Sequence, residues 1–157
     1  MLKIELQPLT LDDCKEVLNL YNNEDVLKFY AKTPILKEEH TPDFFLKITS
    51  NGNRTWKIIN ASDSTRFFGV CSLHDYDKIK ESIEIGGTLL PAFWGNNIML
   101  NAFQILIEKA KINYSIKQII GKTHSKNKKA LRLVEKLNFK IVQSNEHETI
   151  VVMDVVR

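Results

Sequence analysis

Three strand-like segments follow one another in the middle of this chain with no helix between them. They are short and rich in apolar and β-branched residues, and they lie at 55–59, 67–73 and 82–90. Five polar residues, 60–64, separate the first two segments, which is typical of a hairpin connection. Strands joined by such turns pair antiparallel, so this part of the chain predicts an antiparallel meander.

Helix and strand then alternate. Residues 99, 102, 103, 106 and 110 are apolar at helical spacing, and an apolar strand follows at 117–121. A second helix begins at Ser125 or Asn127 and ends near residue 137, before a closing hairpin of 139–142 and 149–156. A helix that links two strands of one sheet brings them parallel, so we predict one parallel contact around residues 90 to 120.

Upstream of the meander, the patterns predict a strand at 2–6 and helices at 10–21, 25–29 and 41–51. The whole order predicts an α+β fold of three layers. Its central sheet is mixed but mostly antiparallel, with six to seven strands flanked by about four helices. Because 157 residues is an ordinary length for one domain, we expect a single domain over residues 1–157.

Composition excludes several classes of protein. Cys14 and Cys71 are too few for a disulfide framework, and no CxxC pair suggests zinc. The N-terminus lacks the apolar core of a signal peptide, and no apolar run approaches the ~18 residues of a membrane span. We therefore expect a cytoplasmic protein that does not act in a membrane.

Positive charge is concentrated in one block. Residues 109–140 contain ten Lys or Arg and a single acid, Glu135, although the net charge of the chain is only +3. Such a block indicates either a surface that attracts phosphate or an ordinary solvated face. It does not separate a nucleic acid from a phosphorylated cofactor, but aromatic side chains do not interleave with the lysines, which makes a nucleic-acid-binding module the less favoured hypothesis.

The usual signatures of several enzyme classes are absent from the sequence. It has no Walker loop, no GxGxxG after a strand, no HExxH and no GxSxG. The histidines are dispersed and predict no metal site; they are His40, His74, His124 and His147. We interpret the pair His74-Asp75 as a surface hydrogen bond.

Two motifs, about 30 residues apart, together carry a family resemblance. Residues 84–99 read EIGGTLLPAFWGNNIM, and residues 127–139 read NKKALRLVEKLNF. The pair resembles the GNAT superfamily of N-acetyltransferases, and most of all the branch that acetylates the α-amino groups of ribosomal proteins. The opening residues 4–13, IELQPLTLDD, are similar to the start of that branch, so the resemblance spans nearly the whole chain.

The resemblance implies transfer of an acetyl group from acetyl-CoA to a primary amine, by direct attack. It also implies the residues that hold coenzyme A. Gly87, Thr88 and Leu89 would pair with the pantetheine arm through their backbone, and the N–H of Leu89 could polarise the thioester carbonyl. The turn before the next helix would bind the pyrophosphate, and it comprises Trp94, Gly95, Asn96, Asn97, Ile98 and Met99. Asn127 would contact the cofactor, or would simply cap the helix.

Several positions depart from the family pattern. Trp94, Asn97 and Met99 replace the usual residues of the pyrophosphate loop, although asparagine tolerates a left-handed backbone better than most residues. The resemblance also places Asn101 where the family often has Glu and Lys122 where some branches have a Glu base. Ala130 stands in place of the serine of this branch, and Val134 in place of the tyrosine that other branches use as general acid. The alternative hypothesis is therefore a protein of this fold that binds acyl-CoA without turnover.

The remaining candidates for chemistry lie near the expected thioester. Glu84 is our candidate base, acting through water, and His124 or Ser125 could relay a proton. Acids on the early helices would favour a cationic amine acceptor; they are Glu24, Asp25, Glu38, Glu39 and Asp43. A homodimer is compatible with the sequence.

Overall fold

A computed structural model describes residues 2–29, 41–50 and 52–156. Its strands form one sheet of seven, in the order β1-β2-β3-β4-β5-β7-β6. The strands are β1 (Ile4–Pro8), β2 (Arg54–Asn60), β3 (Asp63–Asp77), β4 (Ser82–Leu89), β5 (Gln118–His124), β6 (Lys140–Ser144) and β7 (Glu148–Asp154). Neighbouring strands are antiparallel except β4 and β5, which are parallel, as the helix between them requires. The predicted mixed, mostly antiparallel sheet is confirmed.

Five α-helices accompany the sheet in the described residues, where the sequence predicted about four. They are α1 (Cys14–Tyr21), α2 (Glu24–Leu27), α3 (Thr41–Thr49), α4 (Ile98–Asn113) and α5 (Lys128–Lys136). The shortest, α2, forms because the Asn23 side chain accepts hydrogen bonds from the backbone N–H groups of Asp25 and Val26. None of the described helices is long and apolar enough to cross a membrane.

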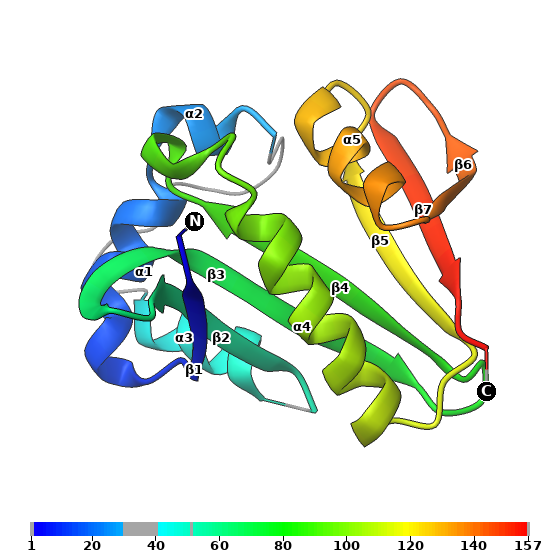
Figure 1. Ribbon diagram of the computed structural model, residues 1–157, viewed down its shortest axis with the longest axis horizontal. Coiled ribbons are helices and arrows are strands. Elements are labelled where there is room, and N and C mark those ends of the chain that lie inside the picture. Colours follow the sequence, from blue (N-terminus) through cyan, green and yellow to red (C-terminus); the bar gives the residue numbers. More distant parts are fainter. Residues whose placement is uncertain (1, 30–40, 51, 157) are drawn as a thin grey trace.

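The helices cover the two faces of the sheet, which gives the predicted three layers (Figure 1). On one face, α4 and α5 pack on a core that includes Phe68, Ile83 and Ile119. On the other, α1, α2 and α3 enclose a smaller cluster around Val17, Leu20 and Val70. Because successive strand residues point to opposite faces, odd-numbered residues of β4 meet α4 and even-numbered ones face away from it.

The connection between β2 and β3 is tighter than the sequence predicted. Asn60 pairs with Asp63, so the turn consists of Ala61 and Ser62 and the expected five-residue turn is wrong. Residues 63–66 are polar and exposed, yet they belong to β3. Asp63 pairs with Asn60, and the register shifts before Phe67 pairs with Ile59.

The parallel contact between β4 and β5 is short. It joins residues 82–85 of β4 to residues 118–121 of β5 and stops at the pair Ile85–Gly121. Beyond that pair, β4 continues along β3 as far as Leu89, and β5 continues along β7 as far as His124. The two strands therefore diverge, and Figure 1 shows the sheet opening between them.

A glycine in β3 allows the end of β4 to lie where it does. A Cβ atom on Gly69 would collide with the backbone carbonyl oxygen of Thr88 and would lie 2.8 Å from Leu89 Cα. Backbone atoms cannot rotate away as a side chain can, so only glycine permits this approach.

We predict that Gly69→Ala lowers the free energy of unfolding by about 3 kcal/mol, the upper part of the range for overpacking a core. Gly121→Ala is the matched control, since its nearest obstacle is one side-chain methyl, Val151 Cγ2 at 2.9 Å, and not the backbone, so it should cost less. Urea unfolding of both variants measures the difference. Equal losses would show that the approach of β4 is not the constraint.

Candidate active site

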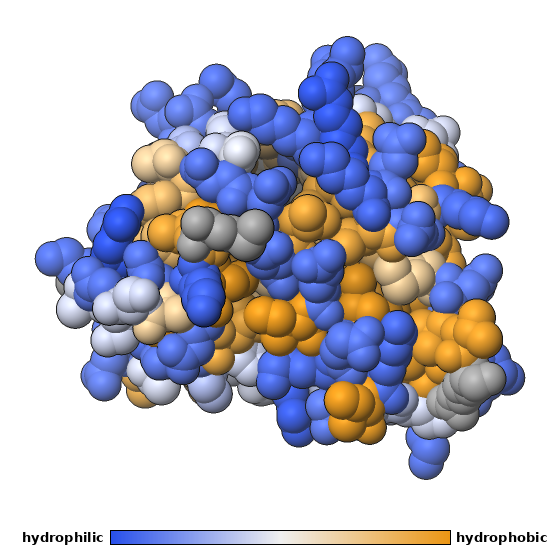
Figure 2. Space-filling view, viewed as in Figure 1, coloured by the Kyte–Doolittle hydropathy of each residue, from blue (hydrophilic) through white to orange (hydrophobic). Residues whose placement is uncertain are grey.

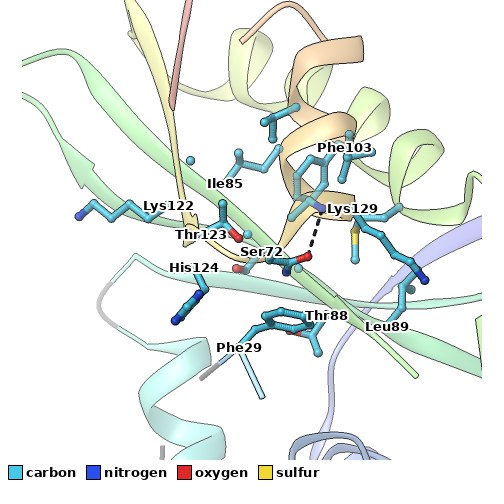
Figure 3. Close-up of a pocket in the computed structure, with 18 of the residues that line it drawn as sticks. Phe29, Ser72, Ile85, Thr88, Leu89, Phe103, Lys122, Thr123, His124 and Lys129 are labelled. Carbon is cyan, nitrogen blue, oxygen red and sulfur yellow. Dashed lines mark hydrogen bonds between the residues drawn. The ribbon is translucent and has the colours of Figure 1, made fainter. Parts of the chain in front are cut away.

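A cleft of about 1960 Å³ opens where β4 and β5 diverge. Side chains from β3, β4, β5, α4 and α5 line it, together with part of the early helices. Figure 3 shows ten of these residues labelled around the common space, with Ser72 near its centre. Of the predicted site residues, the lining includes Glu84, Gly87, Thr88, Leu89, Trp94, Gly95, Asn97, Ile98, Met99, His124 and Asn127. Asn96 and Ser125 are not among the lining residues.

The start of α4 forms one wall of the cleft. Gly95 and Asn97 both have positive φ, of 81° and 59°, which lets the chain turn sharply before the helix begins at Ile98. Asn97 adopts the left-handed conformation, which asparagine tolerates better than most residues. The first backbone N–H groups of α4 have no acceptor within the helix, so this end carries partial positive charge.

Trp94 lies between the end of β4 and α5. Its indole Nε1 donates a hydrogen bond to the carbonyl oxygen of Leu89 at 3.0 Å. The ammonium group of Lys129 lies 5.1 Å from the centre of the indole ring. The tryptophan therefore ties α5 to β4 and does not block the cleft, whose lining continues past it to Glu84.

Met99 is accommodated by the glycine opposite it. A Cβ atom on Gly87 would lie 2.6 Å from Met99 Cε and 2.7 Å from its Sδ. The long side chain thus packs against β4 at a position where β4 has no side chain. This pairing explains how a bulky residue fits near the beginning of α4.

Asn127 is the N-cap residue that precedes α5, as one of our two interpretations predicted. Its side-chain oxygen accepts a hydrogen bond from the backbone N–H of Ala130 at 3.2 Å. The basic residues around this helix start line the cleft; they are Lys126, Lys128, Lys129, Arg132 and Lys136. Hydrophilic side chains cover the outer side of α5 in Figure 2. Much of the basic block is thereby placed at one end of the cleft.

His124 and Ser125 have local partners. His124 Nδ1 accepts a hydrogen bond from the backbone N–H of Lys126, and its ring lies 6.3 Å from that of Phe29. The hydroxyl of Ser125 donates to the carbonyl oxygen of Asn145 and also contacts the Thr149 hydroxyl at 2.8 Å. The two hydrogen bonds of Ser125 hold the β6–β7 hairpin against β5. A proton-relay role for His124 or Ser125 stays a prediction.

Glu84 lies between the imidazole of His74 and the ammonium group of Lys122. Its carboxylate is 3.2 Å from His74 Nε2 and 2.7 Å from Lys122 Nζ, and the side chain is only 15% exposed. The hydrogen bond from His74, aided by the Lys122 ammonium, lowers the pKa of Glu84 even though partial burial acts in the opposite direction. The hydrogen bond to Glu84 in turn raises the pKa of Lys122. Glu84 is therefore held as a carboxylate.

The structure adds two residues that sequence reasoning did not place in the site, Ser72 and His74. Their hydrogen bond is 3.0 Å long, between Ser72 Oγ and His74 Nδ1. The interpretation of His74-Asp75 as a surface pair is wrong, because His74 lines the cleft and contacts Glu84 from the adjacent strand. A two-residue alternation of polar side chains along β3 was the available signal.

His74, Asp75 and Glu84 also offer ligand atoms within 4.8 Å of one another, the spacing of a metal site. The Lys122 ammonium already contacts the carboxylate of Glu84. A divalent cation in this group would lie beside that positive charge, so we interpret the cluster as an ion-pair network.

The early helices contribute apolar side chains to the cleft, where the sequence predicted acids. Tyr21, Val26, Phe29 and Ile48 line its side opposite α5. Glu24, Asp25 and Asp43 are exposed and are not part of the lining, so for these three acids the prediction is wrong. The other predicted acids, Glu38 and Glu39, lie outside the described residues.

A sheet opened between two parallel strands, beside two helix starts and a basic helix, is suited to hold an elongated phosphorylated ligand. The family model of the acetyltransferase (GNAT) domain matches residues 3–140. The chain therefore belongs to the GNAT acetyltransferase family, which makes it an acyltransferase.

Solved structures share the fold at low sequence identity. A domain from Methanocaldococcus jannaschii is 22% identical with a TM-score of 0.84, over 99% of this chain and all of that one. Spermidine N-acetyltransferase from Vibrio cholerae, solved with CoA and spermine, is 17% identical with a TM-score of 0.82, over 97% and 94% of the two chains. RimL, a ribosomal L7/L12 α-N-protein acetyltransferase, is 17% identical with a TM-score of 0.79, over 97% and 90%. None of the curated proteins matches the sequence significantly.

We predict that Glu84 makes stability depend on pH on the acid side. Its pKa is lower in the folded than in the unfolded protein, so its contribution is complete above the unfolded pKa of about 4.3 and is lost as the pH falls through the folded pKa. Wild type should therefore lose unfolding free energy below about pH 4.5, and Glu84→Gln should lose less.

Urea unfolding at a series of pH values between 3 and 7 measures this difference. Glu108→Gln is the control, because that carboxylate lies on α4 with its side chain 66% exposed and should leave the wild-type pH dependence intact. Parallel curves for wild type and Glu84→Gln would contradict the prediction.

Proposed function

We propose that residues 1–157 form a single N-acetyltransferase domain that moves an acetyl group from acetyl-CoA to a primary amine in a ternary complex. The amine is a protein N-terminus or a small amine. The observation that carries the proposal is the cleft between β4 and β5, which extends from the basic start of α5 to the Glu84 carboxylate.

The residues along the cleft fit coenzyme A in chemical terms. The start of α4 presents backbone N–H groups to an anion, and the lysines of α5 supply positive charge for phosphate. Residues 86–89 of β4 extend past the end of the parallel contact, and this segment would pair with the pantetheine arm. When bound, acetyl-CoA supplies the acetyl thioester, and Glu84 lies on the strand beside it.

The same arrangement favours a phosphorylated co-substrate over a nucleic acid. The basic side chains of α5 face the cleft, whereas a nucleic-acid module would spread them over an open surface with aromatic residues between them. Binding without turnover remains the second candidate, because Ala130 and Val134 replace residues of acid–base function in the family. A cytoplasmic location, supported by free Cys14 and Cys71, belongs to the same proposal.

Two named neighbours point to different acceptors. One carries spermidine N-acetyltransferase in its name and the other acts on a ribosomal protein. The described acceptor side of this cleft is mainly apolar, which supports an amine attached to an apolar group over a polyamine. We therefore favour an α-amino group of a peptide, in keeping with the ribosomal-protein branch.

We predict that acetyl-CoA binds saturably and that release of the coenzyme A thiol accompanies turnover of a peptide with a free α-amino group. Calorimetry measures binding, and a thiol-release assay with the peptide and with spermine measures turnover. Binding without thiol release for both amines would support the alternative hypothesis, a protein that binds acyl-CoA without turnover. Lack of saturable binding would overturn the proposed function.

We further predict that Asn127→Ala weakens acetyl-CoA binding by roughly 10-fold, as expected when a hydrogen bond to the ligand of about 1.4 kcal/mol is lost. Asn60→Ala is the matched control, since Asn60 Oδ1 accepts a hydrogen bond from the backbone N–H of Ser62 in the β2–β3 turn and Asn60 does not line the cleft. Unchanged affinity for Asn127→Ala would leave this residue as a helix cap only.

A further inference from the structure

A line of polar groups crosses three strands at the centre of the cleft. Ser72 Oγ lies 3.0 Å from His74 Nδ1, and His74 Nε2 lies 3.2 Å from Glu84 Oε2. The other oxygen of Glu84 lies 2.7 Å from Lys122 Nζ. The line therefore runs from a hydroxyl through an imidazole and a carboxylate to an ammonium group.

Strand register puts these groups on one face of the sheet. Ser72 and His74 are two residues apart on β3, and they lie opposite Gly86 and Glu84 of β4. A Cβ atom on Gly86 would lie 3.1 Å from His74 Cε1 and 3.6 Å from Ser72 Oγ. The missing side chain thus leaves Ser72 and His74 open to the cleft at the point where β4 leaves β5.

The carboxylate fixes the protonation pattern of the imidazole. Glu84 is held ionised by Lys122 and can only accept, so the proton of a neutral His74 lies on Nε2. Nδ1 then carries a lone pair and accepts a hydrogen bond from the Ser72 hydroxyl. The oxygen of Ser72 keeps lone pairs directed at the cleft. In other acyl-transfer sites, an acid likewise holds a histidine in the tautomer that accepts a proton from a hydroxyl group.

We propose that Ser72 and His74 form the proton relay of the acetyl transfer, with Glu84 as the positioning residue that fixes the imidazole. The inference rests on the proposed function. It replaces direct action of Glu84 as the base, because that carboxylate is occupied by His74 and Lys122.

The relay moves one proton. An N–H bond of the substrate ammonium breaks as its proton passes to Ser72 Oγ, and the Ser72 hydroxyl proton passes to His74 Nδ1. The electron pair left on nitrogen forms the C–N bond to the acetyl carbon, and the C–S bond breaks to give the thiolate of coenzyme A. The nitrogen then loses a second proton to solvent, which leaves the neutral amide. The imidazolium, balanced by Glu84, then releases its proton to solvent, from which the thiolate takes one.

Other charged groups around the relay come from four elements. Asp75 follows His74 on β3, and Lys47 of α3 lines the cleft. On β5, attraction to Glu84 and, more weakly, to Glu148 of β7 raises the pKa of Lys122. Glu84 contacts the ring directly. An imidazole base must be neutral to accept a proton, so activity should fall on the acid side of neutral pH.

Kinetics with acetyl-CoA and the faster acceptor of the peptide and spermine tests the relay. His74→Gln and Ser72→Ala should each lower kcat/KM by about 100-fold or more at pH 7 and leave acetyl-CoA affinity within about two-fold of wild type. Ser72→Thr keeps the hydroxyl and should restore most of the activity. Glu108→Gln is the control, because Glu108 lies on α4 with its side chain 66% exposed and does not line the cleft.

The pH profile separates a relay from a structural role. The acid-side fall in kcat/KM should disappear in His74→Gln; an equal loss at every pH from 5.5 to 9, with the acid-side fall intact, would overturn the proposal. A wild type that binds acetyl-CoA but releases no thiol would count against the proposed function itself.

A measurement that needs no turnover tests the proposed relay even if the wild type releases no thiol. Nitrogen-15 NMR of the unliganded protein, with the His74 signals assigned by their loss in His74→Gln, should show a proton on Nε2 and none on Nδ1 at pH 8. The Glu84→Gln variant should change the distribution of this proton between Nε2 and Nδ1. A proton on Nδ1 would contradict the relay, because Ser72 could then only accept from the ring.

Discussion

The parallel contact between β4 and β5 is four residue pairs long, and the site depends on where it ends. Had it continued, residues 86–89 would be bound to β5 and the space between the strands would be filled. Each strand instead follows its antiparallel neighbour, β3 or β7. A strand edge facing a cleft is a ready place for an extended ligand to add hydrogen bonds.

Charge at this opening is arranged in pairs. A carboxylate that is only 15% exposed needs partners, and Glu84 finds them on both neighbouring strands, His74 on β3 and Lys122 on β5. The pairing keeps Glu84 ionised and orients the imidazole of His74. Lys122 therefore has a structural use: its ammonium group holds the carboxylate of Glu84 on β4.

Departures from the family pattern are compensated locally. Met99 occupies the space beside Gly87, and Asn97 adopts the left-handed conformation usual for glycine. Trp94 donates its indole proton to the end of β4 and lies under the ammonium of Lys129. In each case the unusual residue has a partner, so the cleft keeps its shape with a different set of side chains.

The sequence by itself determined the order of helices and strands, the mixed sheet, the start of α4 and the cap of α5, because these follow from local periodicity and capping chemistry. It also indicated Glu84. Only the tertiary structure decided that Ser72, His74 and Lys122 join Glu84. The contacts of Glu84 with His74 and Lys122 depend on strand register between residues 10 and 38 positions apart in the chain. The sequence likewise did not predict the apolar lining that the early helices give to the cleft. Helix packing, and not composition, selects which side chains face the cleft.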